Sequence, residues 1–293
     1  MDFTHLHYFK VLAEYEHMTH AANALHITQP ALSRALRKLE QEFGLPLFDR
    51  VGKYISLNDK GKVLLQYADS ILREMEEVRS VLADKNEQAK KQVSLSMHAS
   101  TPLLPAIICG FRKAHPDISL VITQQGKDVE DAIRECDIVV HSAIQPMERK
   151  NCVPLMTEEI CLALPSSHPL SGQAEISLAQ VASDSFIGLH KGSGLRTVTD
   201  AYCLKAGFLP NIVLESDNPA IVRDLIALGV GLAFIPKISW RDVKYGPNIS
   251  LVDIKDPHCI RYVYMTWREN RYVTKASKLF QQYLADFFEE MRQ

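Results

Sequence analysis

The stretch that decides the fold is residues 28–61, TQPALSRALRKLEQEFGLPLFDRVGKYISLNDKG. Its first half predicts a helix from Thr28, a good N-cap, to about Phe43, where Gly44 ends it. Pro30 is tolerated in the first turn, because its missing N–H would be unpaired there. The apolar residues recur at helical spacing and form one buried stripe: Ala31, Leu32, Ala35, Leu36 and Leu39.

Two further helices are expected before this one. Apolar residues from Phe3 onward recur at near-helical spacing until about Glu16. A second helix follows Thr19, where small alanines allow a close approach to a neighbouring helix, and residues 26–27 break its pattern. Three helices with a tight connection before the third predict a helix-turn-helix.

A short β-hairpin is expected after Gly44. Residues 45–50 are followed by a polar tip at 51–54 and by the alternating residues 55–57. The first 58 residues therefore predict a winged helix-turn-helix.

The polar side of the 28–43 helix has the chemistry that reads DNA. Glutamine pairs with adenine and arginine with guanine, whereas lysine holds phosphates. Any three-helix module with a solvated basic face would give a similar pattern, so this alternative stays open from composition alone. The candidate DNA contacts are Thr28, Gln29, Pro30, Ser33, Arg34, Arg37 and Lys38 on the helix, with Arg50 and Lys53 on the wing.

The whole stretch closely resembles the LysR-type transcriptional regulators. The resemblance is carried by TQPALSR at 28–34, LE at 39–40, FGLPLFDR at 43–50 and LNDKG at 57–61, and in outline it extends along the chain. Asn58 departs from the threonine usual there, and the Lys53-Tyr54 tip is less basic than in many members. The family implies double-stranded promoter DNA as a partner, with a second copy of the chain and RNA polymerase.

Charge and composition limit the classes of protein. The chain has 293 residues and a formal net charge of −2, so no strongly basic tail is present. Residues 1–62 hold eight Lys and Arg against seven acids, which indicates that tight DNA binding needs two copies. No leader or apolar stretch of membrane-spanning length is found, which predicts a cytoplasmic protein without membrane contact. Six scattered cysteines predict reduced thiols, and neither a metal site nor a cofactor is expected.

Residues 59–87 are expected to form a linker helix. Apolar side chains recur at spacings of three and four. This heptad pattern predicts packing against a partner helix. Packing on its own domain is the alternative; the family resemblance favours pairing in a homodimer or homotetramer. The seam is Leu64, Ala68, Ile71, Met75, Val78 and Leu82.

From residue 92 the pattern becomes that of an α/β domain. Strands and helices alternate twice, as in an open parallel sheet, and imply two lobes. The lobes resemble periplasmic-binding-protein folds, whose ligands sit between them. The first lobe is expected at about 92–161 plus 266–293, and the second at about 162–265.

Turns between strands and helices point to the effector site. Ser100 and Thr101 lie where the first strand gives way to a helix, which favours an anion, although simple capping explains them too. The family usually touches its effector at this turn. Further candidates are His141, Ser193, Asn218 and Phe234. The expected ligand is a small anionic metabolite between the lobes.

Three other functions fit the sequence less well. An enzyme is disfavoured, since the sequence has no GxSxG, HExxH or GxxxxGK[ST] motif. A redox sensor would use Cys203, in a helix that resembles a cysteine-bearing segment of the peroxide-sensing branch, but Gly194 stands about where that branch has its reactive cysteine. A solute-binding transport protein is disfavoured, because it would not carry the predicted N-terminal helix-turn-helix, which we call the head.

Overall fold

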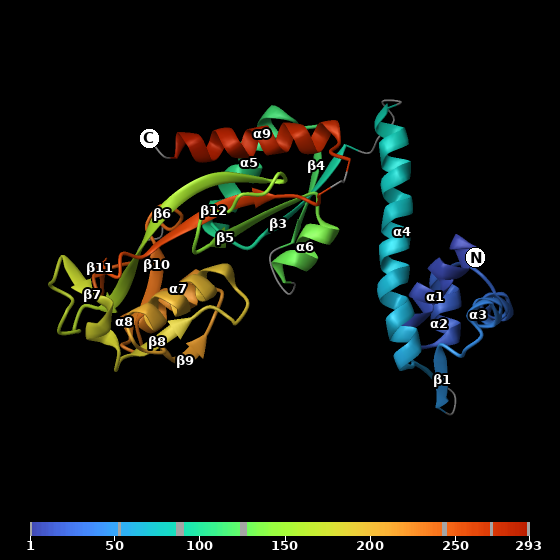
Figure 1. The fold of residues 1–293 in the computed structure, drawn as a ribbon, viewed down its shortest axis with the longest axis horizontal. Helices are drawn as coiled ribbons and strands as arrows, with labels where there is room; N and C mark the ends of the chain where they lie inside the picture. Colours follow the sequence, from blue (N-terminus) through green and yellow to red (C-terminus); the bar gives the residue numbers. More distant parts are fainter. Residues whose placement is uncertain are drawn as a thin grey trace. The chain divides into compact units, whose positions relative to one another are not determined.

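The computed structural model describes residues 2–51, 54–85, 91–123, 128–241, 245–269 and 272–291. The chain divides into two compact units, residues 1–90 and 91–293 (Figure 1). None of the helices within the described ranges is both long and apolar enough to cross a membrane. The predicted class, a winged helix-turn-helix and a linker helix followed by a two-lobed α/β domain, is confirmed.

The first unit contains the three helices, the hairpin and the linker helix that the sequence predicts. They are α1 (Phe3–Tyr15), α2 (Met18–Ala24), α3 (Gln29–Phe43), β1 (Phe48–Val51), β2 (Tyr54–Leu57) and α4 (Asp59–Lys85). Gly44 ends α3 at φ 69°, a left-handed conformation that favours glycine. The core joins Leu6 and Phe9 of α1 to Leu32 and Leu39 of α3, all at most 1% exposed.

Two carboxylates and an amide hold the hairpin. The Glu40 carboxylate accepts from the backbone N–H of Leu47 at 2.8 Å, and that of Glu16 accepts from Leu57 at 2.7 Å. Asn58 accepts from the N–H of Gly61 at 2.9 Å and donates to the carbonyl of Pro46 at 3.0 Å. Asn58 therefore caps α4 and also ties it to the turn before the hairpin.

Gly61 is a site where one added methyl should be costly. A Cβ there would lie 2.2 Å from the backbone oxygen of Leu47 and 2.6 Å from a Leu57 methyl carbon. Gly61→Ala should lower the free energy of unfolding of the head by about 1–3 kcal/mol through overpacking. The urea midpoint measures this loss, with Lys60→Ala on the exposed side as control; equal midpoints for the two variants would contradict the expectation.

The second unit is built on a mixed sheet in the order β4-β3-β5-β12-β6-β11-β7. In the first lobe, β4 and β5 run parallel to β3, while β12 is antiparallel to β5. The first-lobe elements are β3 (Gln92–Met97), a 3-10 turn (Thr101–Leu103), α5 (Leu104–Ala114), β4 (Ser119–Thr123), α6 (Val129–Glu135), β5 (Ile138–Ala143) and α9 (Lys275–Glu290).

The second lobe is built around residues 160–165 of the long strand β6. Two antiparallel strands pair with these residues, and a separate parallel pair, β8 and β9, lies beside its helices. Its elements are β7 (Glu175–Ser177), a 3-10 turn (Leu178–Val181), β8 (Ser185–Gly188), α7 (Gly194–Lys205), β9 (Asn211–Glu215), α8 (Pro219–Ala227), β10 (Ala233–Pro236) and β11 (Ile249–Asp256), and it shares the crossover strands β6 (Cys152–Pro165) and β12 (Ile260–Thr266) with the first lobe.

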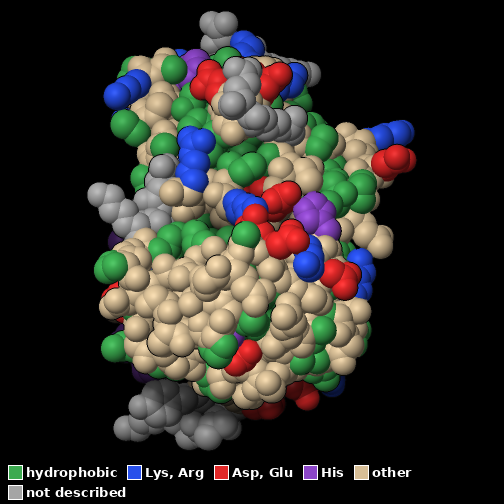
Figure 2. Space-filling model, turned by 90° about the vertical axis from the view of Figure 1, so that its left-hand side faces the viewer, with side chains coloured by type: hydrophobic (Ala, Val, Ile, Leu, Met, Phe, Trp, Pro, Cys, Tyr) green, Lys and Arg blue, Asp and Glu red, His purple; other side chains and the backbone are tan. Residues whose placement is uncertain are grey.

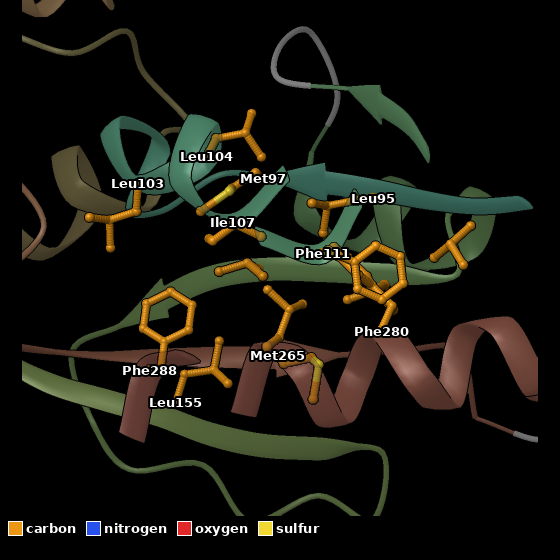
Figure 3. Close-up of a cluster of buried hydrophobic side chains, with 14 of the residues drawn as sticks. Leu95, Met97, Leu103, Leu104, Ile107, Phe111, Leu155, Met265, Phe280 and Phe288 are labelled. Carbon is orange, nitrogen blue, oxygen red and sulfur yellow. The ribbon is translucent and has the colours of Figure 1, made fainter. Parts of the chain in front are cut away.

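A large apolar core fills the first lobe (Figure 3). Leu95 and Met97 of β3 pack in this core with Phe111 of α5 and with Phe280 and Phe288 of α9. Phe111 and Phe280 meet edge to face, with ring centroids 4.6 Å apart. This packing fixes the end of β3, where the candidate effector turn begins.

The lobe crossover differs from the expected boundary at residue 265. Residues 262–266 of β12 pair with β5, so they belong to the first lobe. Both crossover strands, β6 and β12, pass between the lobes near the paired residues Glu158 and Arg261. Sequence spacing does not show where along β12 the pairing passes from one lobe to the other.

Candidate functional site

The predicted DNA-reading face of α3 is exposed. Thr28, Gln29, Pro30, Arg34, Arg37 and Lys38 are exposed, and Ser33 is half-buried. Thr28 occupies the N-cap position, but its side chain makes no capping bond. Lys53 lies outside the described residues, as does the side chain of Arg50. On the opposite side of α3, four of the five residues predicted to be buried are buried, and Ala31 is half-buried.

The seam predicted on α4 is only partly available to a partner. Ala68 is fully buried, so the prediction that it faces another helix is wrong, while Leu64 and Ile71 are half-buried against the core of the helix-turn-helix unit. Met75 is half-buried, whereas Val78 and Leu82 are more than half exposed.

Two aromatic or branched side chains of α4 were missed by the sequence reading. Val63 is 56% exposed and Tyr67 is 65% exposed. With Val78 and Leu82 they span about 100° of the helix surface, given 3.6 residues per turn. We call these four residues the α4 stripe.

A cavity of about 650 Å³ lies between the two lobes. Ser100, Thr101 and Ser193, three of the candidate effector residues, line it together. Trp240 and Arg261 line it as well. Neither was predicted, because neither residue lies at one of the strand-to-helix turns from which the site was predicted.

The other three candidates do not line this cavity. Asn218 caps α8, where its side-chain oxygen accepts from the N–H of Ala220 at 2.9 Å. Phe234 stacks on Phe186 in the second-lobe core, with centroids 5.6 Å apart. His141 is 5% exposed, and its Nε2 lies 2.9 Å from the Thr266 hydroxyl. Their side chains are occupied by capping and packing.

Burial of His141 predicts a pH-dependent stability. Burial, with His98 nearby, lowers the pKa of His141 from 6.5 to about 4. Between pH 6.5 and 4, His141 is therefore protonated in the unfolded chain but neutral in the folded chain. The free energy of unfolding should fall as the pH drops through this range. Urea midpoints between pH 7.5 and 5.5 test this, and His141→Gln should flatten the slope; an equal slope in both proteins would contradict it.

The cavity wall carries charges of both signs. His190 Nδ1 lies 2.6 Å from a carboxylate oxygen of Asp217, and Lys191 and Asp128 are exposed. Burial lowers the pKa of His98, which favours its neutral form. On the face seen in Figure 2, acidic and basic side chains are likewise interspersed rather than gathered by sign.

A buried polar network lies at the lobe crossover, and two of its members, Ser100 and Arg261, line the cavity. The Glu158 carboxylate accepts from Nε and Nη2 of Arg261 at 2.8 and 2.6 Å, and from the backbone N–H groups of Ile238 and Ser239 at 3.1 and 2.8 Å. The Ser239 hydroxyl lies 2.7 Å from Glu158 and 2.9 Å from the Ser100 hydroxyl. The network joins the crossover strands to the predicted effector turn.

The cysteine chemistry does not suit a redox sensor. Cys203 is fully buried, and burial raises its pKa to about 12, so the reactive thiolate is disfavoured. At Gly194, a Cβ would lie 2.7 Å from the Ser142 hydroxyl oxygen and 3.3 Å from the Ser142 carbonyl oxygen. A side chain at 194 would therefore crowd β5.

Both units match known families. Residues 3–62 match the bacterial regulatory helix-turn-helix proteins of the lysR family, and residues 86–289 match the LysR substrate binding domain. The HTH-type transcriptional regulator YybE of Bacillus subtilis is 31% identical, covering 99% of this chain and 100% of that protein.

Solved structures share the fold. Full-length OxyR of Pseudomonas aeruginosa superposes with a TM-score of 0.69 at 24% identity, covering 99% of this chain and 95% of its own. The effector-binding domain of QuiR in complex with shikimate gives a TM-score of 0.57 at 22% identity, covering 68% and 97%. The chain therefore belongs to the LysR family and is a DNA-binding transcriptional regulator, not an enzyme.

Proposed function

We propose that this regulator responds to a small anionic metabolite that binds in the cavity between its lobes, and that it reads promoter DNA as a dimer. The observation that carries the proposal is the interlobe cavity, where Ser100 and Thr101 of one lobe meet Ser193 of the other. A ligand touching both lobes favours one lobe arrangement through its differential affinity. The change in lobe arrangement then alters how the two helix-turn-helix units of the dimer are placed on the DNA.

Hydrogen-bond donors around Ser193 support an anionic ligand. Ser193 is the N-cap residue of the twelve-residue helix α7 and is 8% exposed, and its side chain makes no hydrogen bond within the described part of the chain. Helix N-termini favour negative charge, and Lys191 lines the same wall. The QuiR domain, solved with shikimate, shows that a carboxylate fits a domain of this fold.

The test is a panel of carboxylates against the full-length protein. Binding acids should raise the melting temperature and change the footprint on the DNA upstream of the chain's own gene; transcription by RNA polymerase from that promoter would then give the sign of the response. If no acid in the panel shifts melting or footprint, the proposed effector class is wrong. Ser193→Ala is the matched variant and should weaken binding of the active acid.

On the DNA side, Arg34→Ala should cost about 1–3 kcal/mol of specific binding, because a bidentate contact with guanine is lost. Binding to unrelated DNA should change much less. Lys38→Ala is the control, since loss of a phosphate contact weakens both kinds of binding alike. Gel-shift titrations with the footprinted operator and a scrambled duplex measure the two losses, and equal losses for Arg34→Ala would refute base reading there.

A further inference from the structure

We propose that a second cavity, in the second lobe, binds an uncharged single-ring aromatic compound that carries an oxygen acceptor. The cavity has a volume of about 290 Å³. Its walls come from strands β6, β10 and β11 and from the chain that follows β10. This inference goes beyond the proposed function, because the site is distinct from the interlobe cavity and takes a ligand without charge.

The inner wall of the second cavity is apolar. Cys161, Ile235 and Trp240 line it, and all three are buried. Leu251 lines it too but is 48% exposed, so a ligand can enter on that side. An apolar cavity of about 150 Å³ holds one benzene molecule, so this one has room for a ring with a small substituent. Water molecules would find few polar partners along such a wall.

One polar group of the wall has no partner. The Tyr245 hydroxyl oxygen is buried, and nothing in the described part of the chain hydrogen-bonds to it. Burial raises the pKa of this phenol, so it stays protonated and is able to donate. A buried hydroxyl without a partner is costly, and a ligand oxygen that accepts from it removes that cost. The wall therefore selects a ligand with an acceptor.

The charges around the second cavity already balance. Lys237 lines it, and the Nζ atom lies 2.8 Å from carboxylate oxygens of both Glu159 and Asp253. Arg241 lines the cavity as well, so two cations stand against two carboxylates. An ion entering the cavity would lose its hydration and upset this balance. An uncharged ligand avoids both costs.

Trp240 connects the second cavity to the proposed effector site. Its side chain lines both this cavity and the interlobe cavity. The residue before it, Ser239, donates its backbone N–H to Glu158 in the crossover network. A ligand in the second cavity therefore contacts a wall of the effector site without occupying that site.

Fluorinated probes of one shape test the ligand class. The ketone para-fluoroacetophenone has a carbonyl where para-fluoroethylbenzene has a methylene, and fluorine NMR titration of the full-length protein measures the affinity of each. The ketone should bind about tenfold more tightly, because its oxygen accepts from the Tyr245 hydroxyl. The acid para-fluorobenzoate has a similar size but a charge, and it should bind the second cavity more weakly than the ketone.

Tyr245→Phe tests the donor. This variant should bring the preference for the ketone below about threefold, while the affinity for para-fluoroethylbenzene stays within about twofold of wild type. Because the hydroxyl has no protein partner within the described residues, its removal should leave the urea midpoint unchanged or raise it. A lower midpoint would show that the hydroxyl is already satisfied by water in the free protein.

Leu251→Trp tests the location. The larger side chain on the exposed side of the cavity should weaken binding of both uncharged probes about tenfold or more by filling the space they need. Leu279→Trp on α9 is the matched control, because Leu279 is 46% exposed and lies in the other lobe. This control should leave both affinities unchanged.

Several results would overturn the inference. They are failure of both uncharged probes to bind, equal affinity of the two for wild-type protein, and a Tyr245→Phe variant that keeps the full preference or loses stability. Equal ketone binding by Leu251→Trp and Leu279→Trp would also overturn it. Tighter binding of the benzoate than of the ketone, lost in Leu251→Trp, would overturn the uncharged class. Benzoate binding that Leu251→Trp leaves intact supports the interlobe anion site, so the two proposals can fail separately.

Discussion

Arg261→Met is expected to lower the free energy of unfolding of the effector domain by about 3–5 kcal/mol. The side chains of Arg261 and Glu158 are 2% and 0% exposed, so the change leaves a carboxylate buried without its cation. The backbone N–H groups of Ile238 and Ser239 remain bonded to it, but they do not carry a full positive charge. Urea unfolding of the full-length protein, followed by a probe in the effector domain, measures the loss.

Two comparisons decide whether the loss comes from the unpaired charge. Glu158→Gln combined with Arg261→Met removes both charges and should recover much of the stability, a coupling that a double-mutant cycle reports. Lys255→Met breaks the exposed pair with Glu175, whose side chains are 55% and 57% exposed, and should cost at most about 1 kcal/mol. If Arg261→Met costs no more than Lys255→Met, the buried pair has no special role.

The DNA-binding head could be predicted from sequence because its signals are local. Gly44, Pro30 and the apolar stripe of α3 each act within one helix, and the predicted exposed and buried faces agree with the structure. The contacts that hold the wing, such as Glu16 to Leu57 over 41 residues, are not local, and no periodicity shows them.

The alternation of strands and helices in the effector domain could be predicted from the sequence, but the full extent of the crossover strand β6 could not. β6 runs from Cys152 to Pro165 through both lobes, and its burial pattern changes along its length, so no single periodicity marks it as one strand. The exposed residues of β11 likewise leave it without a clear apolar run. Glu158 and Arg261 lie 103 residues apart, and only the paired strands bring them together.

Sequence identified the site residues that lie in turns at the ends of helices and strands. It missed those that only tertiary packing brings to the cavity. Ser100, Thr101 and Ser193 sit at ends of elements and do line the cavity. His141 is equally close to a strand end, but burial against Thr266 removes it from the wall. Sequence spacing cannot tell a polar residue that faces a cavity from one that satisfies a buried neighbour.

The same limit explains the partly wrong seam on α4. Apolar residues cover more than one face of this helix, and spacing alone does not show which face the head covers. The structure does: Ala68 faces the core, and Val63, Tyr67, Val78 and Leu82 do not. If the regulator binds DNA as the proposed dimer, this exposed apolar stripe is the expected surface for pairing two copies.

Tyr67→Asp and Val78→Asp should therefore each shift the protein from dimer toward monomer and weaken operator binding about 100-fold or more, because the second head no longer binds as part of the same molecule. The expected mechanism is burial of an unpaired carboxylate in the helix pair. Sedimentation velocity gives the oligomeric state, and gel shifts at fixed salt give the affinity.

Gln66→Asp is the matched control for this experiment. Gln66 is exposed like Tyr67, but it lies about 100° around the helix from it, outside the α4 stripe. Because the added charge is the same, any general electrostatic repulsion from DNA appears in the control as well. A dimer that survives both stripe variants with full operator affinity would place the pairing surface elsewhere, whereas equal losses in all three would assign the effect to charge rather than to pairing.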